Sequence, residues 1–565
     1  MPQTTSFRKS IVFLGVVVLT FILYSPVLRN DFVSWDDDAY VLANPYVRSL
    51  DWNNLTNIFS RYYFFSYTPL TLVSHAVDYA LWGFDPRGHH LTSLLLHAVN
   101  TGLFYLLAFQ LLLGAFTARG GNGGWHVPEG LIVAGAALAA LLFAWHPLRV
   151  ESVACVSDRK DLLCALFLFP ATFMYLNRAA DPTRWTAASL GTIAVLYLCA
   201  LLSKSTAIVW PAVLLLLDTL MLDRLKSWRD AFFLVKEKAL LFIIAGGAAW
   251  ITLKSAPVGL VNIYLKNFGR AELMALPFSN FWYYWQKFFW PSDLVVMCKP
   301  ARGWWLFAGA AITITISVAL IVGLFRGKHK MLALVWWSAF IGLLPTLGFL
   351  PSGIEILADR YTYSTMIGAP LLVGAGVILL WRNTASLTIH LSGRVAISVA
   401  LGIIIGVLSW VSLAQIARWR NAKTLWTYAI KIVPENPYAY NNLGCAYFTE
   451  MDYPFAAAAY EEALEAKPDF VVAAYNLANT YFRLEEFEKA KSMYLTSYAF
   501  NRRSDIPCLG LAETFKYLGK ADSTIFWYDK ALSLDSSKAE VYAALGLALE
   551  YVGDSARAAE AYREG

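Results

Sequence analysis

The sequence predicts an all-α membrane protein, in which a polytopic helical bundle of about eleven spans is followed by an α-solenoid. Of the 565 residues, 58% are hydrophobic and only 15% are charged, too few charges for the surface of a soluble protein of this length. Long apolar runs stop near residue 420, where Glu, Lys, Asp and Asn become frequent. Beyond that point, residues recur every 34 positions. We therefore predict a membrane domain over 1–420 and a repeat domain over 421–565.

The spans follow from the apolar runs, because a helix that crosses the hydrocarbon core needs roughly 20 apolar residues. The predicted spans lie near 10–28, 92–116, 130–146, 162–177, 186–202, 206–222, 239–255, 304–325, 331–350, 361–381 and 395–416. The first run lacks a small-residue cleavage site, so we expect it to be retained as a span. The aromatic stretch from Phe278 to Trp290 is short and amphipathic, which favours an interfacial or re-entrant helix.

The basic residues predict the orientation of these spans. With the N-terminus inside, the short inside loops receive the densest basic clusters, as the positive-inside rule requires: Arg178 and Arg184; Arg224, Lys226, Arg229, Lys236 and Lys238; Arg326, Lys328 and Lys330. The outer face then receives 29–91, 146–161, 203–205, 256–303, 351–360 and the repeat domain. The net charge of +6 arises from such clusters and does not indicate nucleic-acid binding. The six cysteines show no zinc or disulfide spacing.

The repeat domain has a period of 34 residues, shared by several sets of positions: Leu443, Leu477, Leu511 and Leu545; Tyr460, Tyr494, Tyr528 and Tyr562; Pro434 and Pro468. This pattern resembles the tetratricopeptide repeat, in which each unit is a pair of antiparallel helices. Stacked units bury a shared core and expose a concave groove. We expect about three to four repeats that bind a protein or peptide; the alternative is a spacer.

The first outer loop carries three consecutive carboxylates, Asp36, Asp37 and Asp38. Like charges repel, so such a run needs a compensating cation, a metal, or a raised pKa suited to proton transfer. A solvated acidic loop or helix cap is the alternative.

Other polar residues also fall at span ends on the predicted outer face, where ionisable groups are candidates for function. They are Tyr67, His75, His146, Glu151, Arg159, Lys160, Lys204 and Arg360. Each also has a structural interpretation. His75 fits a packed core histidine better than a catalytic one. Lys160 and Lys204 are equally consistent with snorkelling to the interface, and Arg360 with a simple pair to Asp359. His89 and His90 lack a second ligand cluster, so no zinc site is predicted.

Together, these segments resemble a known family. The motifs are WDDDAYVLANP, SYTPL, GHHLTSLLLHAVN, HPLRVESVA, DRKDLL, LLSKSTAIVWP and ADRYTY, which precede the repeats. In this order they resemble the transmembrane and tetratricopeptide-repeat-containing O-mannosyltransferases and their bacterial relatives, which are glycosyltransferases of the GT-C class. The resemblance covers nearly the whole chain.

The resemblance implies a polyprenyl- or dolichyl-phosphate sugar as donor, and transfer with inversion to a hydroxyl of a protein or glycan. It implies that Asp36 or Asp37 is the catalytic base, whereas the role of Asp38 and a divalent metal at the three aspartates stay open. We expect the donor phosphate to bind Arg360, with Arg159, Lys160 and Lys204 as further candidates. Tyr67, His75, His146 and Glu151 are expected to position the substrates. Where relatives often carry a Gln-containing segment, this chain has Ser352-Gly353-Ile354-Glu355, so we expect Glu355 to change the donor contacts or the charge balance.

Other functions remain open at this stage. They are a non-catalytic repeat scaffold in the membrane, a ligase or polymerase of surface polysaccharide, and a transporter or flippase. The last ranks lower because the polar groups cluster at span ends and not near mid-membrane. For location we expect a bacterial inner membrane, with site and repeats facing the periplasm, or the endoplasmic-reticulum membrane in a eukaryote.

Overall fold

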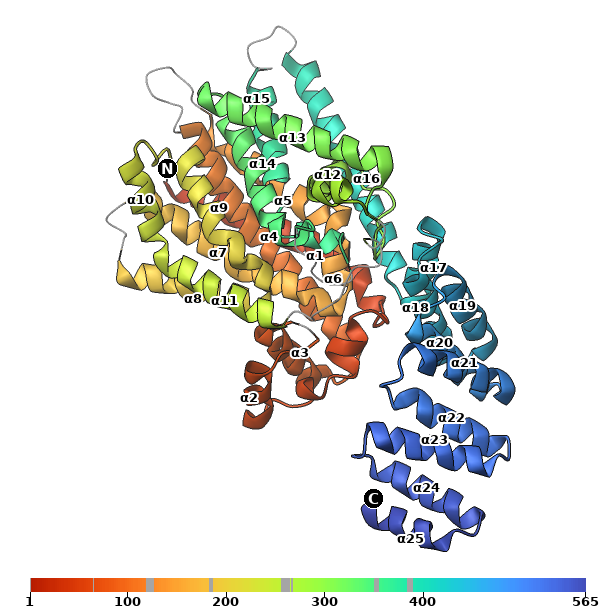
Figure 1. The fold of residues 1–565 in the computed structure, drawn as a ribbon. Helices are drawn as coiled ribbons and strands as arrows, with labels where there is room; N and C mark the ends of the chain where they lie inside the picture. Colours follow the sequence, from red (N-terminus) through yellow and green to blue (C-terminus); the bar gives the residue numbers. More distant parts are fainter. Residues whose placement is uncertain are drawn as a thin grey trace. The chain divides into compact units, whose positions relative to one another are not determined.

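The computed structural model describes residues 2–64, 66–117, 127–181, 186–255, 265, 268–349, 355–383 and 390–565. The chain divides into two compact units, Met1–Asn421 and Ala422–Gly565 (Figure 1). Both units are helical, and the extended pairing among the described residues is an isolated bridge between Tyr63 and Ser66. The predicted all-α fold class is confirmed.

Each predicted span overlaps one α-helix of the first unit: α1 (Pro2–Tyr24), α4 (Pro86–Thr117), α5 (Glu129–Trp145), α7 (Arg159–Ala180), α8 (Ala187–Ser203), α9 (Trp210–Leu216), α11 (Ala239–Ser255), α13 (Gly303–Phe325), α14 (Lys330–Leu343), α15 (Gly368–Asn383) and α16 (His390–Arg418). Five helical segments of the described chain are long and apolar enough to cross a membrane, and a sixth arises if α5 and Pro147–Ala154, bent by 59°, form one span. The remaining apolar helices are shorter.

Two of the shorter helices, α8 and α15, border turns of the chain at the predicted outer face. α8 ends at Ser203, directly before Lys204, and the 3-10 turn Ser205–Val209 then leads into α9. Similarly, α15 begins only at Gly368, because the 3-10 turn Asp359–Thr362 occupies the start of the predicted run. These turns carry the polar motifs, so the broken helices place them at one end of the bundle.

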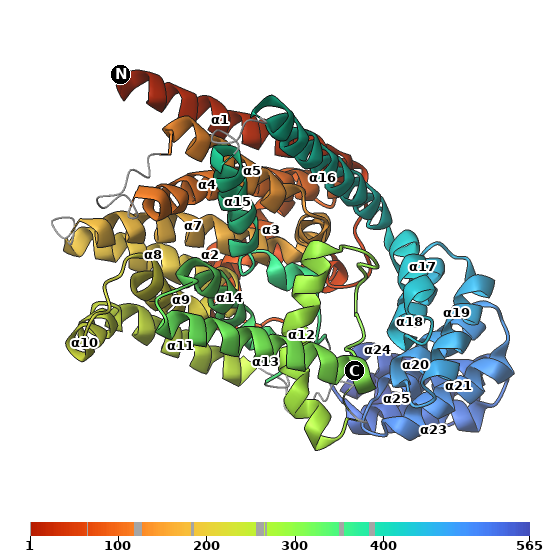
Figure 2. The ribbon, with the colours of Figure 1, turned by 90° about the horizontal axis from the view of Figure 1, so that it is seen from above.

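The centre of the first unit is α4, which packs against α1, α5 and α7 (Figure 2). Aromatic rings fill this contact, with Phe104 and Phe143 at a centroid separation of 4.9 Å. α5 approaches α15 closely because both carry glycine at the crossing. A Cβ on Gly374 would lie 2.5 Å from the carbonyl oxygen of Gly135.

Two further parts flank this bundle. The first outer loop folds into α2 (Trp52–Ser60) and α3 (Pro69–Trp82) around a small core that includes Val47, Ile58 and Leu72. The aromatic stretch predicted to be interfacial or re-entrant lies in the helix α12 (Arg270–Phe289), which packs against α13. It is longer than predicted because Glu272 caps its start at Gly269.

Some of the predicted inside basic residues are paired. Arg224 contacts Asp218 at 2.8 Å and Glu237 at 2.7 Å, and Lys238 contacts Asp218 at 2.5 Å. This buried network joins the end of α9 to α10 (Trp228–Glu237). Arg184 lies outside the described residues.

The second unit begins with α17 (Ala422–Ile432), which is followed by stacked helix pairs: α18 (Pro437–Thr449) with α19 (Tyr453–Ala466), α20 (Val471–Arg483) with α21 (Phe487–Phe500), α22 (Ile506–Tyr517) with α23 (Ala521–Leu534), and α24 (Ala539–Tyr551) with α25 (Ser555–Glu564). Small residues on the first helix of a pair receive the repeated tyrosines. A Cβ on Gly444 would lie 2.6 Å from the ring of Tyr460.

Candidate functional site

The centre of the candidate site is the side chain of Arg360, in the 3-10 turn before α15. Its Nη1 lies 2.7 Å from Oε1 of Glu151 and 3.3 Å from Oδ2 of Asp158, and its Nη2 donates to Glu355. Its backbone N–H donates to the other oxygen of Glu151 at 3.0 Å. Arg360 is thus surrounded by carboxylates and is not limited to the neighbouring Asp359.

Lys160 extends this group along the first turn of α7. Its Nζ lies 3.1 Å from Oδ1 of Asp158 and 3.6 Å from Oδ2 of Asp36. Asp158 therefore bridges Arg360 and Lys160. We define the charged cluster as Asp36, Glu151, Asp158, Lys160, Glu355 and Arg360.

The charged cluster carries more acid than base, with four carboxylates and two cations. Burial raises the pKa of Glu355 to about 8, and the nearby carboxylates add to this effect against the attraction of Arg360. Burial, together with Glu151, also raises the pKa of Asp359 well above its ordinary value. Protonation at Glu355 thus relieves part of the excess negative charge at neutral pH.

The three consecutive aspartates have different surroundings. Asp37 is fully buried, and its oxygens accept hydrogen bonds from the backbone N–H groups of Ser157 at 2.8 Å and Val33 at 3.1 Å. Burial raises the pKa of Asp37 to about 6, although these hydrogen bonds act to lower it. Asp36 remains partly accessible beside Lys160, and Asp38 is exposed. The carboxylates do not converge on one point, and no group of three or more His, Cys, Asp or Glu in the described chain is arranged to hold a metal.

Lys204 lies beside the charged cluster, at the turn between α8 and α9. It pairs with Asp161, and its Nζ lies 5.5 Å from the centroid of the Tyr361 ring. The guanidinium carbon of Arg360 lies 5.6 Å from the centroid of the same ring, so Lys204 and Arg360 both contact Tyr361.

The structure places several of the predicted site residues away from the charged cluster. Arg159 is buried and pairs with Asp78 at 2.5 Å, so its side chain holds α3 and α4 together. His146 accepts from the N–H of Leu148 and lies 2.8 Å from the carbonyl oxygen of Phe288. Tyr67 donates to the carbonyl of Phe59 at 2.8 Å. These contacts are structural.

His75 is a different case. It is fully buried, and neither ring nitrogen has a hydrogen-bond partner among the described residues. Burial and the nearby Arg159 lower its pKa well below the ordinary value, so the ring is neutral. His75 is a buried residue of α3 and is not part of the charged cluster.

Asp158 was not among the predicted site residues, and Glu355 was singled out only as a departure from the relatives; both contact Arg360. Asp158 belongs to the same motif as Arg159 and Lys160, but three ionisable neighbours in sequence gave no indication of which would face the site. Ser352, Gly353 and Ile354, which precede Glu355, lie outside the described residues.

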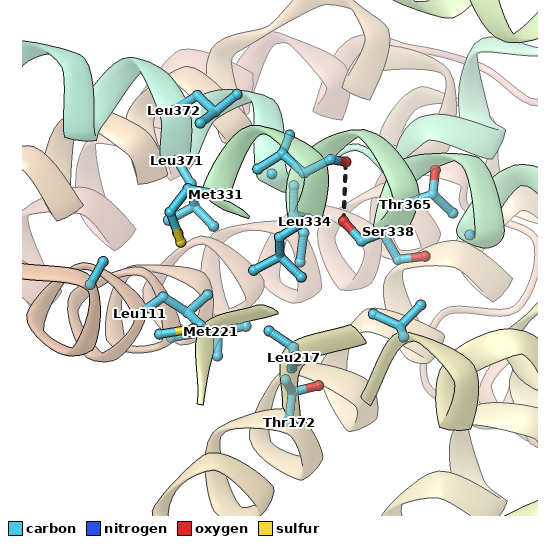
Figure 3. A pocket seen from close by; sticks show the side chains of 18 of the residues that line it. Leu111, Thr172, Leu217, Met221, Met331, Leu334, Ser338, Thr365, Leu371 and Leu372 are labelled. Atoms are coloured by element: carbon cyan, nitrogen blue, oxygen red, sulfur yellow. Dashed lines mark hydrogen bonds between the residues drawn. The ribbon is translucent and has the colours of Figure 1, made fainter. Parts of the chain in front are cut away.

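An apolar cavity of about 420 Å³ lies next to this site, among α4, α7, α9, α14 and α15 (Figure 3). At one end it is lined by Thr206, which closely follows Lys204, by Ser364 and Thr365, which closely follow Tyr361, and by Gly342 near the end of α14. At the other end it is lined by Phe116, Met221, Met331 and Leu379, near the opposite ends of their helices. The cavity therefore runs along most of the bundle, from the side of the charged cluster toward the predicted inside face.

The fold and this site define a polytopic membrane protein that combines buried ion pairs at one end of the bundle with tetratricopeptide repeats. The family model for the tetratricopeptide repeat matches residues 437–470 and 471–502. The chain is 26% identical over 428 residues to protein O-mannosyl-transferase TMTC4 of Mus musculus, covering 67% of this chain and 55% of the relative. It is 23% identical over 492 residues to Tmtc3 of Drosophila melanogaster, covering 77% and 52%.

These matches confirm the resemblance that the motifs indicated, to the tetratricopeptide-repeat-containing O-mannosyltransferases. The chain spans about half the length of these curated relatives. Among solved structures, a crystal structure of MamA is 21% identical with a TM-score of 0.25, covering 25% of this chain and 84% of MamA. The crystal structure of YrrB, a tetratricopeptide-repeat protein, is 21% identical with a TM-score of 0.24, covering 25% and 72%.

Proposed function

We propose that this protein is a GT-C-type membrane glycosyltransferase, which moves a sugar from a polyprenyl-phosphate donor to a hydroxyl of a protein or peptide. The observation that carries the proposal is the apolar cavity, one end of which is lined by Thr206 and Ser364, close in sequence to Lys204 and Tyr361. A lipid-linked sugar needs this combination, because its chain is apolar and its head group is anionic. The relatives named protein O-mannosyl-transferase favour mannose as the sugar.

In this proposal the prenyl chain lies in the cavity, and the phosphate contacts Arg360. The planar guanidinium matches phosphate oxygens in a bidentate geometry. Lys160, which shares Asp158 with Arg360, and Lys204, near the Tyr361 ring, add positive potential. Preorganised cations that face the charge developing on the leaving phosphate can supply several kcal/mol of barrier lowering.

Asp36 is the better candidate for the base, because both oxygens of Asp37 are occupied by backbone N–H groups. Asp36 lies 3.6 Å from Nζ of Lys160 and is partly accessible, so an acceptor hydroxyl can reach its carboxylate. The acceptor hydroxyl gives its proton to Asp36 while its oxygen attacks the anomeric carbon. The bond from that carbon to the phosphate oxygen breaks, and the phosphate leaves with the electron pair. A single displacement inverts the anomeric centre.

The repeat unit is proposed to bind the polypeptide acceptor, as stacked tetratricopeptide repeats offer a concave surface. Tethering the acceptor raises its effective concentration at the site. We propose that both units work on the outer face, which is the periplasm for a bacterial inner membrane.

The first test separates the two aspartates. We expect Asp36→Asn to lower the transfer rate by about 10²–10⁴-fold, the usual contribution of a general base, with unchanged thermal stability. The measurement is mannose transfer from a prenyl-phosphate mannose to peptide by the purified full-length protein. Glu129→Gln, at the opposite end of α5 from His146 and paired with Lys9, is the control and should retain full activity. Full activity of Asp36→Asn would remove the base assignment.

The second test fills the cavity. Ala375 lines it from α15, and we expect Ala375→Phe to raise the KM for a long-chain donor more than for a short-chain one. The reason is that the added ring occupies space needed by the chain. Ile403→Phe, on the exposed side of α16, is the matched control and should leave both KM values unchanged. If Ala375→Phe changed the KM for the long-chain and the short-chain donor by the same factor, the cavity would not hold the chain.

A further inference from the structure

The two ends of the Arg360 guanidinium are held in different ways. Nη1 contacts Glu151 and Asp158, and each of these carboxylates makes a second contact. Glu151 also accepts the backbone N–H of Arg360, and Asp158 also contacts Lys160. Nη2 donates to Glu355. Glu151 and Asp158 therefore fix the position of Arg360. Of the three carboxylates, Glu355 is the one least constrained by other contacts.

The other oxygen of Glu355 supports this difference. Its Oε1 is buried and has no hydrogen-bond partner among the described residues. The residue as a whole is 9% exposed. A buried carboxylate oxygen without a partner is costly, so the ligand-free arrangement around Glu355 is incomplete.

The charges around Glu355 are mostly of its own sign. It faces Arg360 in the 3-10 turn, Glu151 in the short helix after α5, Asp158 before α7, Asp36 in the first outer loop and Asp359. Lys160 is the second cation of the group and is shared by Asp158 and Asp36. An anionic ligand on Arg360 would add to this repulsion unless Glu355 were neutral.

From this geometry we infer that Glu355 is an exchangeable partner of Arg360: the donor phosphate takes its place on Nη2, and Glu355 is protonated in the donor complex. The inference rests on the proposed function and names Glu355 as a positioning residue of the same site. A carboxylate and a phosphate oxygen are recognised by the same guanidinium fork, so one can replace the other without moving Arg360.

The exchange has a defined proton balance. Where Glu355 is ionised in the free protein, binding of one phosphodiester takes up one proton, and the positive charge of Arg360 passes from carboxylate to phosphate. Where Glu355 is already protonated, no proton is taken up. Since the free-state pKa is about 8, the affinity should be constant below that pH and should fall as the pH rises above it.

The test is binding of a prenyl methyl phosphodiester, whose single charge does not titrate in this range, to the full-length protein from about pH 6.5 to about pH 9.5. For the wild type we expect Kd to rise by up to about tenfold per pH unit above about pH 8. For Glu355→Gln, which mimics the protonated acid, we expect a Kd that does not change with pH. Glu129→Gln is the control and should show the wild-type profile.

The outcomes are distinct. Equal pH slopes in the wild type and Glu355→Gln would overturn the exchange and leave the proposed donor site standing. No binding by the wild type at any pH, or unchanged binding by Arg360→Ala, would overturn the donor site and the exchange together.

A measurement on the wild type alone covers the case in which Glu355→Gln does not fold. Calorimetry of the wild type at about pH 8.5 in two buffers of different ionisation enthalpy should report uptake of a substantial fraction of one proton, and an absence of uptake would refute the exchange.

Discussion

At the scale of single residues, the outer-face polar groups form two sets with different tasks. Asp36, Lys160 and Arg360 meet in the charged cluster, where their partners are other side chains. Asp37 and Arg159 instead tie backbone segments together. Each oxygen of Asp37 accepts a backbone N–H, and the side chain is fully buried, so adjacent residues in one motif have separate roles.

Asp37 gives a prediction on stability. Its folded-state pKa of about 6 lies above the ordinary 3.8, so its contribution is fully present below about pH 4 and is lost as the pH rises through about 6. The ionised form costs about 3 kcal/mol relative to the neutral one. Asp37→Asn lacks this titration. We therefore expect the Tm of the wild type, relative to that of Asp37→Asn, to rise on acidification from about pH 7.5 to about pH 5. A Tm difference that does not change with pH would contradict the burial of an ionisable Asp37.

At the scale of elements, interrupted helices position the candidate site in the first unit, whereas regular helix pairs build the repeats in the second. In the first unit, the interruptions before α9 and α15 place Lys204 and Arg360 at the bundle end. In the second unit, each helix pair turns at a residue with positive φ. These residues are Met451 (62°), Glu485 (61°), Gly519 (70°) and Gly553 (83°), each 34 positions after the last. Two of the four turns thus use a non-glycine residue in the left-handed region.

This leads to a prediction for the turn between α20 and α21. The left-handed conformation costs an L-residue about 1 kcal/mol, so Glu485→Gly should stabilise the helix pair by about 0.5–1 kcal/mol. Hydrogen exchange of α20 and α21 in the full-length protein is the measurement. The matched control is Glu462→Gly in the middle of α19, which should destabilise by about 1 kcal/mol. Slower exchange in the control than in Glu485→Gly would refute the turn argument.

At the scale of the whole molecule, one bundle end gathers segments that are far apart in sequence. Asp36, Lys160, Lys204 and Arg360 come from four separate parts of the chain, and the apolar cavity begins beside them. The repeat unit is a separate compact unit. The membrane unit therefore contains every group proposed for donor binding and proton transfer.

This division predicts the effect of removing the repeats. A chain that ends at Asn421 should bind the prenyl phosphodiester with the wild-type Kd, because the cavity and the charged cluster remain. Its transfer to a polypeptide acceptor should fall, through a higher KM for the acceptor, because the tether is lost. Transfer to a short free acceptor peptide serves as the control. If the truncated chain used its native polypeptide acceptor as well as the full-length protein, the repeats would not be the acceptor-binding unit.

The sequence by itself determined the helical fold class, the apolar runs and the 34-residue repeat, because these depend on local periodicity and composition. Apolar runs mark helices wherever they stand, and every predicted run overlaps one. Only the tertiary structure decided which ionisable residues meet. Arg159 and Lys160 are neighbours in sequence, yet one pairs with Asp78 and the other with Asp158, because successive residues at a helix start point in different directions. The contacts of Arg360 with Glu151, 209 positions earlier, and the depth of the cavity depend on packing between helices, which no local pattern encodes.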